Sequence, residues 1–394
     1  MKPITCPGFK AAGIHAGLKK NNEKDIGLIT SDFPASVAGV FTTNRVKAAP
    51  VLLDMERVKT GRCRAIVVNS KNANCCTGER GMQDALAMGR AVSKALNIDE
   101  SDVMVASTGV IGSPLPIEKI KAATPDLVQS LAPEGFMNCA QAMMTTDTVP
   151  KLVHRQGEID GTTFTVTGLA KGSGMIAPNM ATMLCFVCTD VIAQPDTLKA
   201  VLLKSVGKSL NCIIVDGDTS TNDTTLIMAN GQSGVSLENN AEVDVFQQVL
   251  DEVLMSLARE LVRDAEGATK VVGIDVRGAA SPEDARIVAE TIANSPLVKT
   301  AIFGEDANWG RIAAAVGRAG VPFEPDRLDI FFDGIQMVSN GLSCGGQAES
   351  AATEVLKRPE FIVIVDLNGG QGEASVLTCD FSIDYVKINA DYRS

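Results

Sequence analysis

Thr182 is the residue whose type and position most directly suggest chemistry. Residues 171–181 read Lys-Gly-Ser-Gly-Met-Ile-Ala-Pro-Asn-Met-Ala, and their glycines and proline should keep this stretch out of regular structure. Thr182 then begins an apolar run to Val187 that predicts a strand. Cleavage between Ala181 and Thr182 would place a hydroxyl and a free α-amine on one residue, which supplies a nucleophile and a base together. The spacing alone favours a simpler alternative, a glycine-rich turn whose threonine only starts a strand.

Histidine is scarce, which limits the catalytic schemes that are available. Only His15 and His154 are present, so the chain has few histidines from which to form a metal site or a Ser-His-Asp triad. Another group must act as the base, and the amine of an N-terminal threonine meets that need.

Thr108 and Gly109 follow a strand that is predicted over Val103–Ser107. A small residue at the end of a strand lets a backbone N–H approach a reacting carbonyl, and a neighbouring hydroxyl can donate a second hydrogen bond. The pair therefore suits an oxyanion hole. The alternative is an ordinary turn that ends a strand.

Two charged residues also stand at positions that could serve a site. Lys171 lies eleven positions before Thr182, where its charge would help to keep a nearby amine neutral or would bind a substrate carboxylate. The alternative is a solvated loop lysine. Glu266 follows a helix predicted from Val243 to about Ala265, with Gly267 as its C-cap. A carboxylate at a helix C-terminus calls for a cationic partner, either a substrate amine or a nearby Lys or Arg.

Two further motifs give no cofactor site. Cys185-Phe-Val-Cys188 has CxxC spacing but lies within the predicted strand after Thr182, and no second such pair completes a zinc site. The acidic segment 216–223 resembles a calcium loop, yet Thr221 and Ile227 stand where the EF-hand pattern needs Gly and Glu. We therefore expect no metal and no organic cofactor.

Composition and charge narrow the class of protein. A chain of 394 residues has room for about two to three domain-sized units, and 45% hydrophobic with 21% charged residues fits a soluble globular protein. The net charge of -11 argues against a nucleic-acid partner. The first ten residues lack the apolar core of a signal peptide, and no apolar run of about 18 residues could span a bilayer. We therefore expect a cytoplasmic protein with no membrane partner, whose ten cysteines are reduced thiols.

Short apolar runs alternate with amphipathic patterns, which predicts a mixed α/β fold. Strands are predicted at 65–69, 103–107, 164–169, 183–188, 212–216, 224–229, 271–276, 330–332, 361–367 and 375–379. Helices are predicted at 82–96, 136–144, 198–210, 243–265, 285–292 and 347–356. The longest of them has apolar residues on one face.

Six other segments accompany the stretch from Lys171 to Leu184 in a fixed order along the chain. They are Val68-Asn-Ser-Lys-Asn-Ala-Asn74, Ser107-Thr-Gly-Val-Ile-Gly112, Thr145-Thr-Asp-Thr148, Asp216-Gly-Asp-Thr-Ser-Thr-Asn-Asp-Thr224, Asn308-Trp-Gly-Arg311 and Ile388-Asn-Ala-Asp-Tyr-Arg-Ser394. Together these segments resemble the ornithine acetyltransferase (glutamate N-acetyltransferase) family of arginine biosynthesis. Lys71 and Ala307 depart from the Gly and Pro that family members often have there, which affects only the local shape of two loops.

The resemblance implies a four-layer α/β/β/α sandwich that two fragments of a self-cleaved precursor build jointly. The alpha fragment would be residues 1–181, with the oxyanion hole and the cleavage loop. The beta fragment would be residues 182–394, with a C-terminal subdomain from about residue 271. Two copies of each fragment would form an α2β2 heterotetramer.

The resemblance also implies the role of each site residue. Thr182 would be the nucleophile, with its freed amine as the base, and Thr108 and Gly109 would form the oxyanion hole. The substrate contacts would be Thr145, Lys171, Thr182, Glu266, Asn389 and Ser394. For Thr145, the adjacent Thr146 could match the same family position, so the register of this assignment is open by one residue.

The activity that the resemblance implies is acetyl transfer from N2-acetyl-L-ornithine to L-glutamate through an acetyl-Thr182 ester. Some family members also accept acetyl-CoA as the donor. One alternative is a hydrolase on the same scaffold, like the related aminopeptidases and amidases, with water in place of glutamate. A second alternative is a non-catalytic ligand-binding relative.

Overall fold

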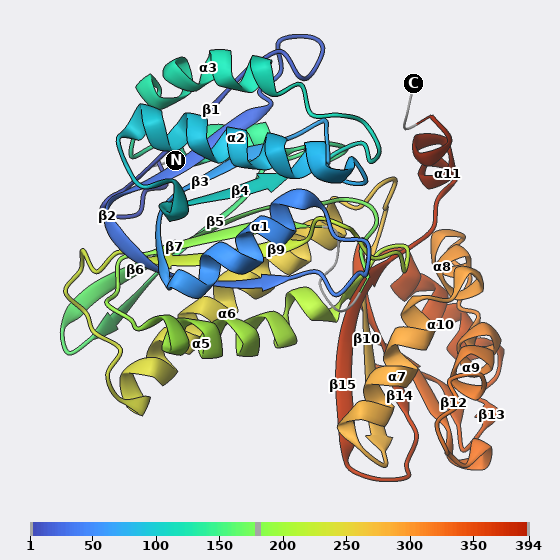
Figure 1. Cartoon of the computed structure of the whole chain (residues 1–394). Helices are drawn as coiled ribbons and strands as arrows, with labels where there is room; N and C mark the ends of the chain where they lie inside the picture. Colours follow the sequence, from blue (N-terminus) through green and yellow to red (C-terminus); the bar gives the residue numbers. More distant parts are fainter. Residues whose placement is uncertain (1–2, 178–182, 392–394) are drawn as a thin grey trace. The chain divides into compact units, whose positions relative to one another are not determined.

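The computed structural model describes residues 3–177 and 183–391. These residues form two mixed β-sheets and the helices that pack on them (Figure 1). The chain divides into two compact units. The N-terminal unit contains Met1–Asn211 and Asp218–Leu261, and the C-terminal unit contains Cys212–Gly217 and Val262–Ser394. The predicted α/β class is confirmed.

Eight strands form the sheet of the N-terminal unit. They are β1 (Phe9–Ile14), β2 (Ile26–Phe41), β3 (Arg62–Asn69), β4 (Val103–Ser107), β5 (Lys151–Ile159), β6 (Thr162–Lys171), β7 (Leu184–Thr189) and β9 (Thr224–Ala229). Their order is β4-β3-β2-β9-β7-β6-β5, and β1 pairs with β2 outside this path. The pairs β3–β4 and β7–β9 are parallel, and the others are antiparallel.

The long strand β2 belongs to two parts of this sheet. Its residues 26–31 pair with β1, and its residues 36–41 pair with β9. Its register with β3 shifts between Thr30 and Ala35, and such a bulge bends a strand and increases its twist. The bend therefore lies where β2 joins β1, β3 and β4 to the strands β9, β7, β6 and β5.

Two apolar cores lie on opposite faces of β2 and β3. The helices of this unit are α1 (Ala49–Arg57), α2 (Gly78–Leu96), α3 (Ile117–Gln129), α4 (Phe136–Met143), α5 (Pro195–Lys208) and α6 (Asn240–Arg263). Ile29 and Ile66 belong to a buried cluster with residues of α4, β6, β7 and β9. The adjacent Leu28 and Ala65 belong to a second cluster with α2 and α3. Successive side chains of a strand point to opposite faces, so both faces of this part of the sheet are covered.

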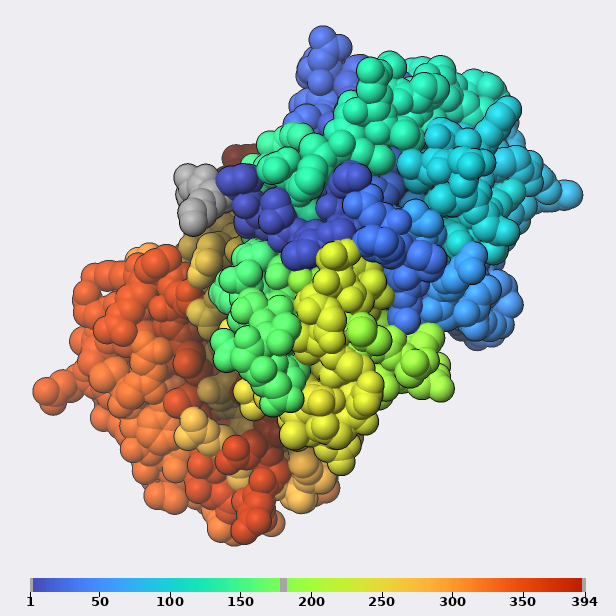
Figure 2. All heavy atoms as spheres, turned by 90° about the vertical axis from the view of Figure 1, so that its left-hand side faces the viewer, coloured from blue at the N-terminus to red at the C-terminus, as the bar shows by residue number. Residues whose placement is uncertain are grey.

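The long helix α6 packs on β5 and β6. The rings of Phe164 and Phe246 lie 5.8 Å apart. Gly168 of β6 has no side chain at the point where Val253 and Leu257 of α6 approach it. Figure 2 shows the β5–β6 hairpin, in green, beside the start of α6, in yellow. The apolar face that the sequence predicts for this helix is thus its buried face.

The C-terminal unit contains a seven-stranded sheet with the order β13-β12-β11-β14-β10-β15-β8. Its strands are β8 (Ile213–Ile214), β10 (Val271–Ala279), β11 (Asp329–Phe332), β12 (Ile335–Ser339), β13 (Leu342–Ser343), β14 (Glu360–Asp366) and β15 (Gly372–Cys379). Its helices are α7 (Pro282–Ala293), α8 (Pro296–Phe303), α9 (Trp309–Gly317), α10 (Gly346–Leu356) and α11 (Ile383–Ala390). Short 3-10 turns occur in the two units at Val58–Thr60, Glu100–Asp102, Leu210–Cys212 and Pro325–Arg327. Apolar residues of β10, β14, α7 and α9 form the core of the C-terminal unit.

Several predicted boundaries are wrong by a few residues. The helix predicted over 243–265 runs from Asn240 to Arg263, and Gly267, with φ of 68°, closes the turn that follows instead of capping the helix. The strand predicted over 212–216 contains only Ile213–Ile214, because only these two residues pair with β15, at Leu377 and Thr378. None of the helices within residues 3–177 and 183–391 combines the length and the apolar character that crossing a bilayer requires.

Candidate active site

A buried cluster of one carboxylate and two amines lies at one end of β5 and β6. Lys151 begins β5, and Lys171 ends β6. The Nζ of Lys151 lies 2.7 Å from one carboxylate oxygen of Asp147, and the Nζ of Lys171 lies 4.0 Å from the other. The side chains of Asp147 and Lys151 are fully buried, and that of Lys171 is 4% exposed. Lys171 is therefore a buried residue and not the solvated loop lysine of the alternative interpretation.

Asp147 remains ionised in this cluster. Its carboxylate accepts hydrogen bonds from the N–H of Gly172 at 2.7 Å and of Thr145 at 3.0 Å. Burial alone would raise its pKa, but the charges of Lys171 and Lys151 and the hydrogen bonds from Lys151 and Gly172 hold the pKa of Asp147 well below its usual range. The carboxylate thus fixes the two backbone segments that carry Thr145 and Lys171.

The structure brings together Lys171 and Thr108, two of the predicted site residues. The Nζ of Lys171 donates a hydrogen bond to Oγ1 of Thr108 at 3.2 Å, although the two residues are 63 positions apart. Thr108 comes directly after β4 and is 5% exposed. Next to it, Gly109 has φ of 133°, and a Cβ there would lie 2.2 Å from the carbonyl carbon of Lys71. Only glycine fits this position, so the backbone conformation of the turn depends on Gly109.

Amide side chains that the sequence reasoning did not assign hold this turn. Asn222 donates from Nδ2 to the carbonyls of Ser107 at 2.8 Å and Ala73 at 2.7 Å. Asn69 accepts a hydrogen bond from the Ser107 hydroxyl at 2.6 Å, and its carbonyl accepts from the N–H of Thr108 at 3.0 Å. Both asparagines stand in the segments that carried the family resemblance, which was the available signal for their role.

The backbone of Met183, the residue after Thr182 in the sequence, is held from both sides. Its N–H donates to Oδ1 of Asp223 at 2.9 Å, and its carbonyl accepts from the N–H of Thr224 at 3.1 Å. Burial raises the pKa of Asp223 well above its usual range, and the hydrogen bond from Met183 only partly opposes this effect. Sequence reasoning missed Asp223, too. Ala181 and Thr182 themselves lie outside the described residues.

Thr145 and Thr146 both lie beside the carboxylate cluster. The helix α4 ends at Met143, as the polar residues after it predict. The N–H of Thr145 bonds to Asp147, whereas the hydroxyl of Thr146 lies 2.6 Å from the hydroxyl of Ser173. The choice of Thr145 as the substrate contact therefore stays a prediction.

Glu266 and Asn389 meet in the C-terminal unit. Glu266 lies in the turn after α6 and is buried, and its Oε2 accepts a hydrogen bond from Nδ2 of Asn389 at 2.8 Å. Asn389 belongs to α11. Within the part of the chain that the structure describes, the partner of Glu266 is thus this amide and not the Lys or Arg of the alternative interpretation. Ser394 lies outside the described residues.

The other motifs have structural roles. Cys185 and Cys188 are buried in β7, and burial raises the pKa of Cys185 to about 12, so this thiol stays protonated. None of the ten cysteines, all of which the structure describes, is in a disulfide. Over residues 3–177 and 183–391, no group of three or more His, Cys, Asp or Glu side chains is placed to hold a metal ion.

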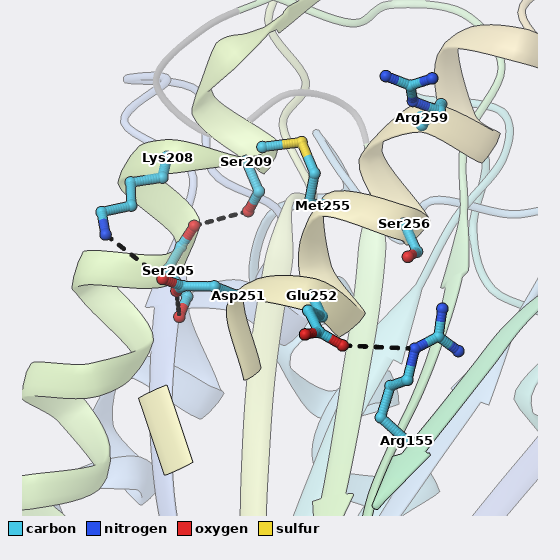
Figure 3. A pocket seen from close by; sticks show the side chains of 9 residues that line it. All are labelled: Arg155, Ser205, Lys208, Ser209, Asp251, Glu252, Met255, Ser256 and Arg259. Atoms are coloured by element: carbon cyan, nitrogen blue, oxygen red, sulfur yellow. Dashed lines mark hydrogen bonds and ion pairs between the residues drawn. The ribbon is translucent and has the colours of Figure 1, made fainter. Parts of the chain in front are cut away.

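A cavity of about 620 Å³ in the N-terminal unit lies away from these residues (Figure 3). It is lined by Arg155, Ser205, Lys208, Ser209, Asp251, Glu252, Met255, Ser256 and Arg259. Asp251 accepts from the Ser205 hydroxyl at 2.5 Å and pairs with Lys208 at 3.3 Å, and Glu252 pairs with Arg155 at 3.7 Å. Because both of its carboxylates already pair with cations, the cavity gives no reason to move the predicted site.

In this α/β protein a buried lysine bonds to a strand-end hydroxyl next to a turn that only glycine fits, an arrangement consistent with an acyl-transfer enzyme. The ArgJ family profile matches residues 10–394. The arginine biosynthesis bifunctional protein ArgJ of Geobacter sulfurreducens is 54% identical over 389 residues, which cover 98% of this chain and 99% of that protein. Its counterpart in Desulfotalea psychrophila is 51% identical over 390 residues, again 98% and 99% of the two chains. The crystal structure of the Bacillus halodurans protein of the same name is 36% identical, covers 52% of this chain and 97% of that chain, and gives a TM-score of 0.50. The chain belongs to the ArgJ family, which confirms the resemblance found in the sequence.

Proposed function

We propose that this member of the ArgJ family is an N-acyltransferase of arginine biosynthesis that moves the acetyl group of N2-acetyl-L-ornithine to L-glutamate. Membership of the family along nearly the whole chain is the observation that carries the proposal. The products are L-ornithine and N-acetyl-L-glutamate. Neither half-reaction needs a metal or an organic cofactor.

The reaction proceeds in two steps through Thr182. The Thr182 hydroxyl attacks the acetyl carbonyl of N2-acetylornithine, and the free amine of the same residue takes the hydroxyl proton. The carbon–nitrogen bond then breaks, the proton passes to the leaving amine, and ornithine departs from an acetyl ester. The amine of glutamate attacks this ester, and the Thr182 oxygen regains a proton as N-acetylglutamate leaves.

Thr108 and Gly109 stabilise the negative oxygen that forms in each step. The contact between Lys171 and Thr108 supports this role. Because the Thr108 oxygen accepts a hydrogen bond from Lys171, its own hydrogen is directed elsewhere and can be donated to a developing oxyanion. Lys171 adds a positive charge behind that donor, which strengthens it.

The substrate contacts that we propose are those that the family resemblance implies. Thr145 and Lys171 stand at the buried carboxylate of the N-terminal unit. Glu266 and Asn389, which bond to each other, supply a carboxylate and an amide for the ornithine amines. Ser394 completes the set from the tail.

Self-cleavage between Ala181 and Thr182 produces fragments of residues 1–181 and 182–394. The strand order supports their remaining together, because β7 and β9 of the second fragment lie between β2 and β6 of the first. Separation would break the ladders of two strand pairs, β2–β9 and β6–β7, and no disulfide is needed to prevent it.

A four-layer α/β/β/α arrangement accounts for one contact in particular. Thr108 follows β4 and Lys171 ends β6, and these strands are separated by β3, β2, β9 and β7 in the sheet. A flat sheet would keep them apart by several strand spacings of about 4.8 Å each. A sheet that folds over at the bulge in β2, with helices on its outer faces, accounts for their 3.2 Å hydrogen bond.

We propose a second acetyl donor, an oligomeric state and a cellular location from the family. The word "bifunctional" in the relatives' name supports acetyl-CoA as a second donor for glutamate. Two copies of each fragment form an α2β2 heterotetramer. The reaction takes place in the cytoplasm, which ten cysteines outside any disulfide favour.

An assay of the purified protein tests this function. N2-acetylornithine with glutamate, N2-acetylornithine alone and acetyl-CoA with glutamate are compared side by side, and a denaturing gel reports cleavage. Transfer to glutamate well above release to water is expected. Glutamate-independent hydrolysis would favour the hydrolase instead, and an uncleaved, inactive chain would favour a binding relative.

A further inference from the structure

Lys299 of α8 is a buried lysine that the proposed mechanism does not use. It is 1% exposed and lies in the C-terminal unit. Its Nζ donates to Oγ1 of Thr378 at 2.8 Å and to the carbonyl of Cys379, at the end of β15. Its own carbonyl accepts from the N–H of Phe381 at 3.2 Å. The side chain of Lys299 therefore binds the end of β15, and its backbone carbonyl binds the segment that leads from β15 into α11.

The amine also lies over an aromatic ring. Nζ is 5.0 Å from the ring centroid of Phe381, which is within the range of a cation–π contact. The Phe381 ring stacks on Tyr385 of α11, with centroids 4.7 Å apart and an interplanar angle of 22°. The Tyr385 hydroxyl in turn donates to Asp216 at 3.3 Å. Lys299, Phe381 and Tyr385 thus form one column that runs from α8 to α11.

Asn389 stands one helical turn beyond this column. Its Nδ2 donates to the carbonyl of Tyr385 at 3.0 Å and to Glu266 at 2.8 Å. The place of Tyr385 therefore sets where the Asn389 amide meets Glu266. The turn that carries Glu266 is close by, since a Cβ on Gly267 would lie 2.6 Å from the Tyr385 backbone nitrogen.

The helix α11 needs an anchor of this kind. It has eight residues, and none of them, all within the described part of the chain, is buried. A helix this short is not stable in water by its own hydrogen bonds. A buried amine also carries a large desolvation cost unless several groups bind it. Two oxygen acceptors at the end of β15 and the aromatic face of Phe381 supply that binding for Lys299. Phe381 belongs to the segment that leads from β15 into α11.

We propose that Lys299 is a positioning residue, which fixes α11 through Phe381 and Tyr385 and so sets the Asn389–Glu266 pair for the ornithine part of the substrate. The assignment of that pair to the substrate rests on the proposed function. The positioning of α11 does not, because it concerns contacts within the substrate-free protein.

Hydrogen exchange and steady-state kinetics on the full protein test this inference. The variants are Lys299→Met, which keeps an unbranched side chain as far as the ε atom but removes the amine, and Lys299→Arg, which keeps a cation. Lys357→Met serves as the control, because Lys357 is an exposed lysine of the same unit. In Lys299→Met, we expect faster exchange of the amides of 383–390, with β10 and β14 unchanged. We also expect KM for N2-acetylornithine to rise about tenfold with kcat within about twofold, the size of effect that loss of a buried cation–π contact gives. Lys299→Arg should recover part of both effects.

Phe381→Leu covers the case in which Lys299→Met does not fold. It removes the ring and leaves the amine with its two oxygen acceptors, and it should loosen 383–390 in the same way. Exchange of 383–390 at the wild-type rate in Lys299→Met, or in Phe381→Leu if the first variant is unfolded, would overturn the proposal. If the unmodified protein does not use N2-acetylornithine, the proposed function fails, while the exchange result still decides whether Lys299 positions α11.

Discussion

Replacing Asp147 with asparagine should destabilise the protein strongly. The carboxylate of Asp147 accepts from Lys151 and Gly172 on one oxygen and from Thr145 on the other. An asparagine offers one oxygen and one NH2 group, so at least one of these donors would face another donor. Two buried lysines would also lose their carboxylate. Removing one partner of a buried ion pair typically costs about 3–5 kcal/mol, a large part of the roughly 5–15 kcal/mol that stabilises a folded protein.

Urea unfolding of Asp147→Asn, Lys151→Met and the double variant measures this cost. Asp147→Asn leaves two buried amines without the carboxylate, and Lys151→Met leaves the carboxylate with Lys171 alone. The double variant removes both members of the 2.7 Å pair and leaves only the amine of Lys171. We expect the double variant to lose at least about 1 kcal/mol less than the two single losses together, as coupled neighbours do. A loss in Asp147→Asn below about 1 kcal/mol, or strict additivity in the cycle, would refute the cluster's stabilising role.

The same cluster predicts an acid limb in stability. The pKa of Asp147 is depressed in the folded protein, so its contribution is complete above the unfolded value of about 3.9 and is lost as the pH falls below it toward the folded value. Unfolding free energies measured between about pH 5 and pH 2 should therefore fall less steeply in Asp147→Asn than in the wild type. Parallel pH profiles would contradict the depressed pKa.

The remaining predictions concern the reaction. Thr182→Ala should leave one uncleaved, inactive chain on a denaturing gel, because the attacking hydroxyl is absent, and two bands from this variant would exclude Thr182 as the cleavage nucleophile. Thr108→Ala should lower kcat far more than it changes KM, since one oxyanion donor is worth about 3–4 kcal/mol, and a change confined to KM would indicate a binding role. Deletion of residues 389–394 should nearly abolish use of N2-acetylornithine while cleavage persists, and wild-type turnover would remove the tail from the site.

The sequence predicted elements with regular patterns well and elements with interrupted patterns poorly. The strands at 103–107 and 224–229 match β4 and β9 at both ends, because they are uninterrupted runs of buried residues. The sixteen-residue strand β2 was missed. It contains Pro34, which normally argues against a strand. Pro34 is tolerated because it lies in the bulge between Thr30 and Ala35, where no ladder hydrogen bond is required.

The site was predictable in its members but not in its contacts. Thr108 and Lys171 were predicted as site residues from segments that resemble the family. Nothing in the sequence placed them within hydrogen-bond distance, because that contact depends on the bend of β2. Asp147 and Asp223 were passed over, although both stand in those segments. Their importance comes from burial and from the backbone groups that they bind, and the sequence shows neither. Asn308, by contrast, accepts from the N–H of Arg311 and caps α9, which is a structural role for a segment that served only as a family marker.

The order of events along the chain follows from what holds Met183. Both groups that fix its backbone, the carboxylate of Asp223 and the N–H of Thr224, come from a segment about forty residues later. That segment is in place only when β9 has paired with β7 in parallel and with β2 on its other side. A parallel pair cannot form as a local hairpin, so these contacts require most of the N-terminal unit to be folded. The proposed cleavage before Thr182 therefore comes after folding. The cut then frees the Thr182 amine when strands of the two fragments already alternate in one sheet, so the pairs β2–β9 and β6–β7 continue to hold the fragments together.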